Sequence, residues 1–144
     1  DNYYAPTAIE TLVRHLCSRK EVDLVYSAYR HVDERGQVDP DVIYRPLPWG
    51  LPFANTIGPF FLYRRTVYQQ IGEYREDMEY EEDYDYWLRV YRHFKMWRLH
   101  FPLYYYRRHP KSMAAYYQGH PELWGKARRA RFKQAIREPI EVEN

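Results

Sequence analysis

The most acidic stretch of the sequence contains two carboxylates that have the character of a catalytic base. Glu82 and Asp83 stand where a loop is predicted to become a helix over residues 83–94. The positive end of a helix dipole keeps a carboxylate ionised, and an ionised carboxylate can take a proton from a substrate hydroxyl within hydrogen-bonding reach. Spacing alone favours a plainer interpretation, in which Glu82 and Asp83 are ordinary acidic residues of a first helical turn.

A second group of candidate residues lies in the basic segment 106–112. It combines two guanidinium groups, an ammonium group, an imidazole and a hydroxyl, and Pro110 restrains the chain. These groups belong to Arg107, Arg108, Lys111, His109 and Ser112. Together they can clamp a diphosphate through charge-assisted hydrogen bonds. His109 can instead bind a metal ion through one ring nitrogen. A solvated basic loop is the alternative that spacing alone favours.

A second basic segment is predicted to be a helix over residues 121–137. Its cations include Lys126, Arg128, Arg129, Arg131 and Lys133. A run of cations without acidic residues can contact anionic lipid or a phosphorylated partner. The alternative is a solvated helix face, which the modest apolar stripe on the opposite side favours.

Two common catalytic designs have no support in the sequence. There is no GxSxG nucleophile motif and no glycine-rich phosphate loop of the GxGxxG or GxxxxGK type. The single cysteine, Cys17, is predicted to be a buried thiol within a helix, and it leaves no internal disulfide framework or zinc-finger spacing.

The elements that must position these residues alternate between helices and strands. We expect helices over residues 5–19, 64–71 and 83–94, and strands over residues 21–29, 58–63, 95–99 and 103–106. Pro102 separates the last two strands, Gly36 marks a turn, and Gly72 is expected to end the second helix. Residues 37–55 hold four prolines and predict a long ordered loop or an irregular edge segment. The mixture predicts an α/β or α+β fold, with α/β the favoured class, and too few strands for a complete doubly wound sheet.

The helix patterns also predict contacts. In the first helix, Ile9, Leu12, Val13 and Leu16 follow helical spacing. In the third, one apolar face is predicted to contain Tyr84, Trp87, Leu88 and Tyr91. Asp85 and Arg89 are four positions apart and are expected to pair on the helix surface.

Composition limits the classes of protein to which the chain can belong. A chain of 144 residues with 45% hydrophobic residues fits one globular domain. A net charge of +2 gives no reason to expect nucleic acid as a partner. No apolar run reaches membrane-helix length. The single cysteine is compatible with a reducing, cytoplasmic setting, which is the expected location. Aromatic residues reach 19%, and 17 tyrosines are typical of a surface that binds sugar faces or other proteins, although a tyrosine-rich core would give the same count.

Read in order, several segments resemble the second half of a family 2 glycosyltransferase with the GT-A fold. The resemblance runs from Asp1 to about Met113. Asp1–Pro6 looks like the end of the family's "DxDDxYxP" segment, and Val22–Ser27 resembles the strand that follows it. Segments similar to the acceptor-side strand, the following "iGgyde" turn, the "xEDxDLWLR" element and the "YRxHxxSxS" loop are Asn55–Arg65, Ile71–Tyr74, Glu81–Arg89 and Tyr106–Ser112.

The resemblance implies a reaction and a set of roles. It implies an inverting transfer of a sugar from a nucleotide-diphosphate donor to a saccharide or other hydroxyl acceptor. Asp83 would be the general base, and Glu82 would shape the acceptor site. Arg107, Arg108, His109 and Ser112 would bind the donor diphosphate. A divalent metal, Mg²⁺ or Mn²⁺, would be held by Asp1 and His109.

The resemblance also implies what kind of domain this is. Residues 1–120 would be the acceptor-side part of a GT-A domain, a partial mixed sheet flanked by helices without the N-terminal nucleotide-binding strands, and residues 121–144 would be a basic helix and tail. We expect residues 1–144 alone to have no transferase activity, and an uncovered sheet edge to favour a homodimer. Residues 44–55 follow no pattern that names the acceptor.

Two other classes of function stay open at this point. One is a non-catalytic carbohydrate-binding or protein-interaction module that keeps the acceptor half of the fold. The other is a scaffold that makes a peripheral membrane contact through the basic helix predicted over residues 121–137.

Overall fold

The described part of the chain forms a mixed sheet with helices on both of its faces. The computed structural model describes residues 2–78, 81–112, 115–116 and 119–120. Within these residues the sheet order is β1-β5-β2-β3, and β4 also pairs with β2. The strands are β1 (Tyr3–Tyr4), β2 (Leu24–Val32), β3 (Val38–Ile43), β4 (Phe61–Tyr63) and β5 (Met96–Arg107). The α/β class with a mixed, helix-flanked sheet is therefore confirmed. Asp1 and the basic helix predicted over 121–137 lie outside the described residues.

Strand β2 is the centre of the sheet. Its residues Leu24, Val25 and Tyr26 are fully buried, which is the continuous apolar pattern of a strand covered on both faces. β5 runs parallel to it on one side, and the shorter β3 and β4 pair antiparallel on the other. The turn predicted at Gly36 joins β2 to β3, and Gly36 has a φ of 85° there.

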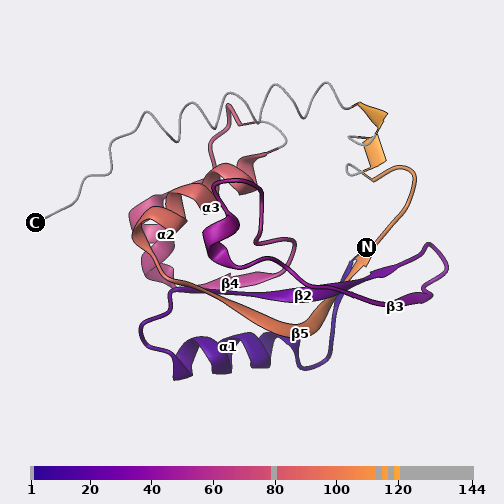
Figure 1. Cartoon of the computed structure of the whole chain (residues 1–144), viewed down its shortest axis with the longest axis horizontal. Helices are drawn as coiled ribbons and strands as arrows, with labels where there is room; N and C mark the ends of the chain where they lie inside the picture. Colours follow the sequence, from indigo (N-terminus) through magenta and orange to yellow (C-terminus); the bar gives the residue numbers. More distant parts are fainter. Residues whose placement is uncertain (1, 79–80, 113–114, 117–118, 121–144) are drawn as a thin grey trace, which may run out of the picture.

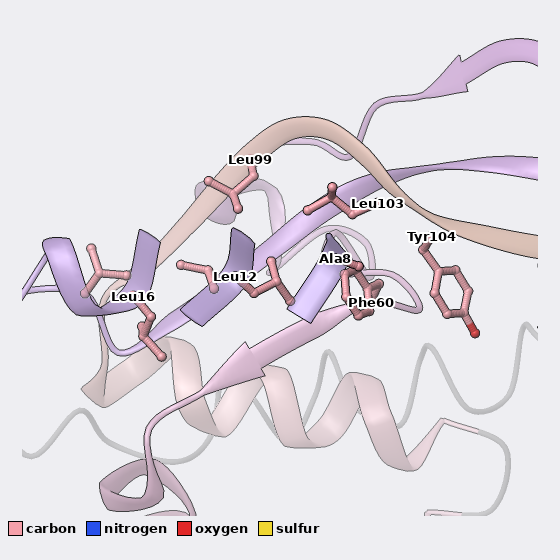
Figure 2. Packing of buried hydrophobic residues seen from close by; sticks show 9 residues of the cluster. Ala8, Leu12, Leu16, Phe60, Leu99, Leu103 and Tyr104 are labelled. Atoms are coloured by element: carbon pink, nitrogen blue, oxygen red, sulfur yellow. The ribbon is translucent and has the colours of Figure 1, made fainter. Parts of the chain in front are cut away.

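In the described part of the chain, helices cover both faces of the sheet (Figure 1). α1 (Ala8–Ser18) lies on one face, while α2 (Arg65–Ile71) and α3 (Glu82–His93) lie on the other. On the α1 face, Ala8, Leu12 and Leu16 pack in one cluster with Leu99 and Leu103 of β5 (Figure 2). The second cluster, on the α2 and α3 face, is built around Leu24, Tyr26, Trp87 and Val90.

The buried stripe of α1 is narrower than its apolar residues suggested. Leu12 and Leu16 are buried, but Ile9 and Val13 are 51% and 44% exposed. Cys17 is also exposed, so the prediction of a buried thiol was wrong. These three residues recur every fourth position, and the sheet contacts the helix along Ala8, Leu12 and Leu16 instead.

Strand β5 runs through Pro102, so the prediction of two separate strands was wrong. Its register against β2 shifts where the proline lies: Ser27 pairs with Leu99, but Ala28 pairs with Pro102. His100 and Phe101 are extra residues at this bulge. A proline lacks the N–H that a regular ladder needs, and bulges tolerate it because the ladder is already interrupted there.

The outer edge of β5 is the side that faces away from β2. In the residues that the structure describes, β1 pairs with it at Tyr104 and Tyr105. The homodimer expected to use such an edge stays a prediction.

Arg64 fastens α1 to the sheet from the loop before α2. Its guanidinium group donates to the carbonyl oxygens of Leu16 at 2.6 Å, of Val22 at 2.9 Å and of Arg19 at 3.3 Å. Carbonyl groups at the end of a helix have no partner within the helix. Arg64 therefore supplies the C-terminal partners of α1 from a residue 45 or more positions away in the sequence.

Replacing Arg64 by alanine is expected to destabilise the chain by about 2–3 kcal/mol, because partly buried carbonyl groups lose charge-assisted hydrogen bonds. Urea unfolding followed by circular dichroism measures the change. Arg65→Ala is the matched control, since Arg65 is the exposed neighbour at the start of α2. Equal losses in the two variants would show that Arg64 does not fasten α1.

Candidate functional site

The carboxylate of Asp83 is held in a fixed position in the first turn of α3. Its Oδ2 accepts a hydrogen bond from the side-chain amide of Asn55 at 2.9 Å, and its Oδ1 accepts one from the backbone N–H of Tyr84 at 2.6 Å. Asp83 is partly buried, whereas Glu82 is exposed. Of the two acidic residues predicted for catalysis, Asp83 is the one whose carboxylate the structure orients.

An ion pair between Asp85 and Arg89 also holds the first turn of α3 in place. Asp85 is 7% exposed and contacts Arg89 at 3.0 Å and Arg75 at 3.6 Å. Arg89 also donates to the carbonyl oxygens of Ile71 and Glu73. The prediction of a surface pair was wrong, because the chain that follows α2 covers the pair and supplies these further partners.

Asn55 belongs to a long segment, residues 44–60, that is fastened to α3 and to the sheet. The hydroxyl of Tyr84 donates to the carbonyl oxygen of Leu51 at 2.7 Å, next to the bond between Asn55 and Asp83. From the sheet, the hydroxyl of Tyr26 donates to the carbonyl oxygen of Pro46 at 2.6 Å. Burial raises the pKa of Tyr26, so this donor keeps its proton throughout the physiological range.

A glycine makes the end of this segment possible. Gly58 has a φ of 80°, and a Cβ added there would lie 2.8 Å from Nε of Arg45. That same Nε donates to the carbonyl oxygen of Thr56 at 3.1 Å, and Nη2 donates to Asn55. Any larger residue at position 58 would displace the arginine that closes the loop around Asn55.

Tyr74 completes the surroundings of Asp83. Burial, followed by the nearby Tyr63, Asp83 and Glu82, raises the pKa of Tyr74 to about 12. Its ring lies against Tyr86 with centroids 4.7 Å apart. Tyr74 therefore keeps its hydroxyl proton at neutral pH and lies within the field of the Asp83 carboxylate.

The basic segment 106–112, which spans the end of β5 and the turn after it, lines an open pocket of about 690 Å³. Arg107, His109 and Lys111 come from this segment, and the hairpin between β2 and β3 adds Glu34 and Arg35. Arg35 was not among the sequence candidates, because only the hairpin geometry brings it to the pocket. Three permanent cations around one pocket suit an anionic ligand such as a diphosphate.

Arg107, at the end of β5, joins the pocket to the β2–β3 hairpin and to the segment that starts at Asn2. Its Nη1 donates to the carbonyl oxygen of Asp33 at 2.7 Å, and its backbone N–H donates to Oδ1 of Asn2 at 2.8 Å. The segment that starts at Asn2 therefore lies beside the pocket. Asp1, the predicted metal ligand, lies outside the described residues.

His109 shares the pocket of Arg107, but the structure separates Arg108 and Ser112, the other two predicted phosphate ligands, from it. Arg108 lines a second pocket with His31 and Asp39, on the β3 side. The hydroxyl of Ser112 accepts the backbone N–H of Ala115 at 3.1 Å, so its oxygen is used within its own turn. Asp83 is not among the residues that line either pocket.

The described residues do not complete a metal site. His109 is surrounded in its pocket mainly by cations, and Glu34 is the carboxylate of that lining. Within the described part of the chain, no three His, Cys, Asp or Glu side chains gather in a way that could hold a metal ion. The predicted pair of Asp1 and His109 stays a prediction from the family resemblance.

Two histidines make the stability depend on pH. Burial and the nearby Arg108 lower the pKa of His31, against the opposing effect of Asp39, and burial with Arg19 and Arg14 lowers the pKa of His15. The unfolded chain therefore binds these protons more readily, so the free energy of unfolding is expected to fall as the pH falls below about 6.5. Urea unfolding at pH 7.5 and 5.5 measures it, and a His15→Gln/His31→Gln variant should lose less. An equal loss in the variant would contradict this assignment.

Comparison with models of protein families gave no match, and comparison with curated proteins gave no significant match. None of the helices in the described ranges is long and apolar enough to cross a membrane. The geometry around Asp83 and around the basic pocket is what bears on the function of this chain.

Proposed function

We propose that this chain supplies the catalytic base and the acceptor side of an inverting glycosyltransferase. The observation that carries the proposal is the carboxylate of Asp83, which is partly exposed in the first turn of α3 and oriented by the amide of Asn55. A general base needs a fixed, ionised carboxylate that a substrate hydroxyl can reach. The resemblance to family 2 glycosyltransferases assigns this role to the same residue.

The proposed step is a direct displacement. The acceptor oxygen forms a bond to the anomeric carbon of the donor sugar while its proton passes to Asp83. The bond from that carbon to the diphosphate breaks, and its electron pair leaves with the nucleoside diphosphate. Attack opposite the leaving group inverts the configuration at the anomeric carbon.

The basic pocket supports the donor half of this proposal. Arg35, Arg107 and Lys111 contribute three cations to one pocket, which suits a diphosphate, and His109 adds a hydrogen-bonding nitrogen. When bound, Mg²⁺ or Mn²⁺ would further offset the charge on the leaving diphosphate. Within this chain, the residues that we assign to the leaving group are Arg107 and His109.

A non-catalytic carbohydrate-binding module is the second candidate. It would use the same surface around Asn55 and Asp83 to bind a sugar, without a donor. It differs from the transferase in one measurable property, since it requires no nucleotide binding by any longer form of the chain.

The experiment is a calorimetric titration with uridine and thymidine diphosphates in the presence of Mn²⁺. It is made on residues 1–144 and on the same chain extended upstream by about a hundred residues, a typical domain length. We expect binding to the extended chain and no detectable binding to residues 1–144. Because Arg107 contributes a cation to the diphosphate pocket, Arg107→Ala is expected to weaken binding by about tenfold or more.

Arg92→Ala is the control, because Arg92 lies in the last turn of α3 and does not line the pocket. Binding that Arg107→Ala leaves unchanged would contradict the pocket assignment. A lack of binding by both chains would favour the carbohydrate-binding module.

A further inference from the structure

The segment 44–60 presents large apolar side chains to water although it is firmly fixed. Trp49 is 67% exposed and Phe53 is 73% exposed. The residues between and around them are not loose, because Leu51 is fully buried and its carbonyl oxygen accepts the hydroxyl of Tyr84. Ordered aromatic side chains that remain in water mark a binding surface more often than a scattered apolar residue does.

Backbone hydrogen bonds hold both aromatic residues in ordered turns. Residues 48–54 wind through consecutive helical turns, in which Leu51 N–H donates to Pro48 and Phe53 N–H donates to Gly50. Trp49 lies in the 3₁₀ turn Pro48–Gly50 and Phe53 in the turn that follows it, so the two exposed residues flank the buried Leu51 in the sequence. We name Trp49 and Phe53 the aromatic platform.

The aromatic platform belongs to the segment that bonds to the proposed base through Asn55. Phe53 stands between the two points at which this segment bonds to the first turn of α3, the carbonyl oxygen of Leu51 and the amide of Asn55. Phe53 is therefore two residues from the side chain that holds the Asp83 carboxylate.

The charges around the aromatic platform indicate what can bind there. Arg45 is the single charged residue of segment 44–60, and its guanidinium group is bonded to the carbonyl oxygens of Asn55 and Thr56. The neighbouring turn of α3 is acidic, with Glu82 and Asp83. These carboxylates would repel an anionic membrane or a phosphorylated ligand, but they would not repel a neutral polyhydroxyl ligand.

We infer that the aromatic platform of Trp49 and Phe53 is the acceptor subsite and that the acceptor is a neutral saccharide. A sugar ring offers an apolar C–H face to an aromatic ring and hydroxyl groups at its edge, which the Asn55–Asp83 pair can bind. The inference rests on the proposed function, since it takes Asp83 as the base toward which the sugar hydroxyl points. It adds the chemical class of the acceptor.

The test is binding of residues 1–144 to an array of neutral hexose, deoxyhexose and N-acetylhexosamine oligomers, without nucleotide or metal. We expect binding that Trp49→Ala weakens by about tenfold or more, as for a central aromatic contact, and that Trp49→Phe largely retains. Trp97→Ala is the matched control, because Trp97 is also exposed but stacks with Arg19 beside α1. Thermal melting checks that each variant stays folded.

Two results would overturn the inference. One is the absence of binding to every oligomer of the array, and the other is binding that Trp97→Ala weakens as much as Trp49→Ala does. Vesicles of phosphatidylcholine, with and without phosphatidylglycerol, are tested in parallel, and vesicle binding that depends on Trp49 without glycan binding would assign the platform to a membrane surface. Failure of the proposed function is seen separately, in the nucleotide titration of the extended chain.

Discussion

Asp83→Asn is expected to lower the rate of sugar transfer by about 10²–10⁴-fold, the usual contribution of a general base. The asparagine keeps the shape of the side chain, and its carbonyl oxygen can still accept the amide of Asn55. The substitution removes the ability to take a proton from the acceptor. The measurement is the release of nucleoside diphosphate by the extended chain, with the donor whose nucleotide binds in calorimetry.

Asp83→Asn also removes a negative charge from a helix N-terminus, which by itself costs about 0.3–1 kcal/mol of stability. Glu10→Gln is the control for that effect, because Glu10 is an acidic residue in the first turn of α1. The control is expected to transfer sugar at the unmodified rate. A similar fall in rate for Glu10→Gln, or a rate within threefold of the unmodified chain for Asp83→Asn, would contradict the role of Asp83.

Arg89→Met is expected to cause the largest loss of stability, about 3–5 kcal/mol. The substitution leaves the buried carboxylate of Asp85 with only the more distant Arg75 among its two arginine partners. A buried charge that loses its close partner destabilises the fold, because its desolvation is no longer offset by the ion pair. The substitution also leaves the carbonyl oxygens of Ile71 and Glu73 without this donor. The midpoint of thermal unfolding should fall by roughly 10 °C for a chain of this size.

Two further variants test the physical reason for that loss. Lys95→Met removes a cation just beyond the end of α3 at an exposed position, and is expected to change stability by less than about 0.5 kcal/mol. The double variant Asp85→Leu/Arg89→Met removes both charges and should recover part of the loss. A double variant that is less stable than Arg89→Met alone would show that the ion pair is not the cause.

The sequence predicted the helices better than their environments. Local signals were enough for α2, since Gly72 takes a φ of 80° and ends that helix as expected. The pairing of Asp85 with Arg89 was also visible from the spacing. The burial of this pair was not, because it depends on Arg75 and on the carbonyl groups that follow α2, and those contacts come from the tertiary fold.

Long-range contacts explain the other differences. Pro102 is a strong local signal for a break, and it was outweighed by the long parallel pairing of β5 with β2, which accommodates the proline at a bulge. Asn55 belongs to a segment that resembles the family's acceptor-side strand, but its bond to Asp83 joins residues 28 positions apart. The role of Arg64 was equally hidden, since its acceptors lie on α1.

The candidate site was predictable in part for the same reason. Arg107, His109 and Lys111 are close in the sequence, and the structure gathers them in one pocket. Arg108 and Ser112, in the same segment, lie elsewhere: Arg108 lines the second pocket with His31 and Asp39, and Ser112 bonds within its own turn. Arg35 and Trp49 have no recognisable motif, and only the exposure and the packing of their loops distinguish them.

The parallel pairing of β2 with β5 has a consequence for how the chain folds. Leu24 pairs with Met96, so the centre of the sheet closes a loop of about seventy residues that contains the hairpin, the aromatic platform, α2 and α3. Closing such a loop costs chain entropy before the contacts within the sheet offset it, and parallel pairings of this kind form slowly. The two bonds that fasten the aromatic platform's segment to α3 lie inside this loop and join residues 33 and 28 positions apart, so closing them costs less chain entropy than closing the central strand pair.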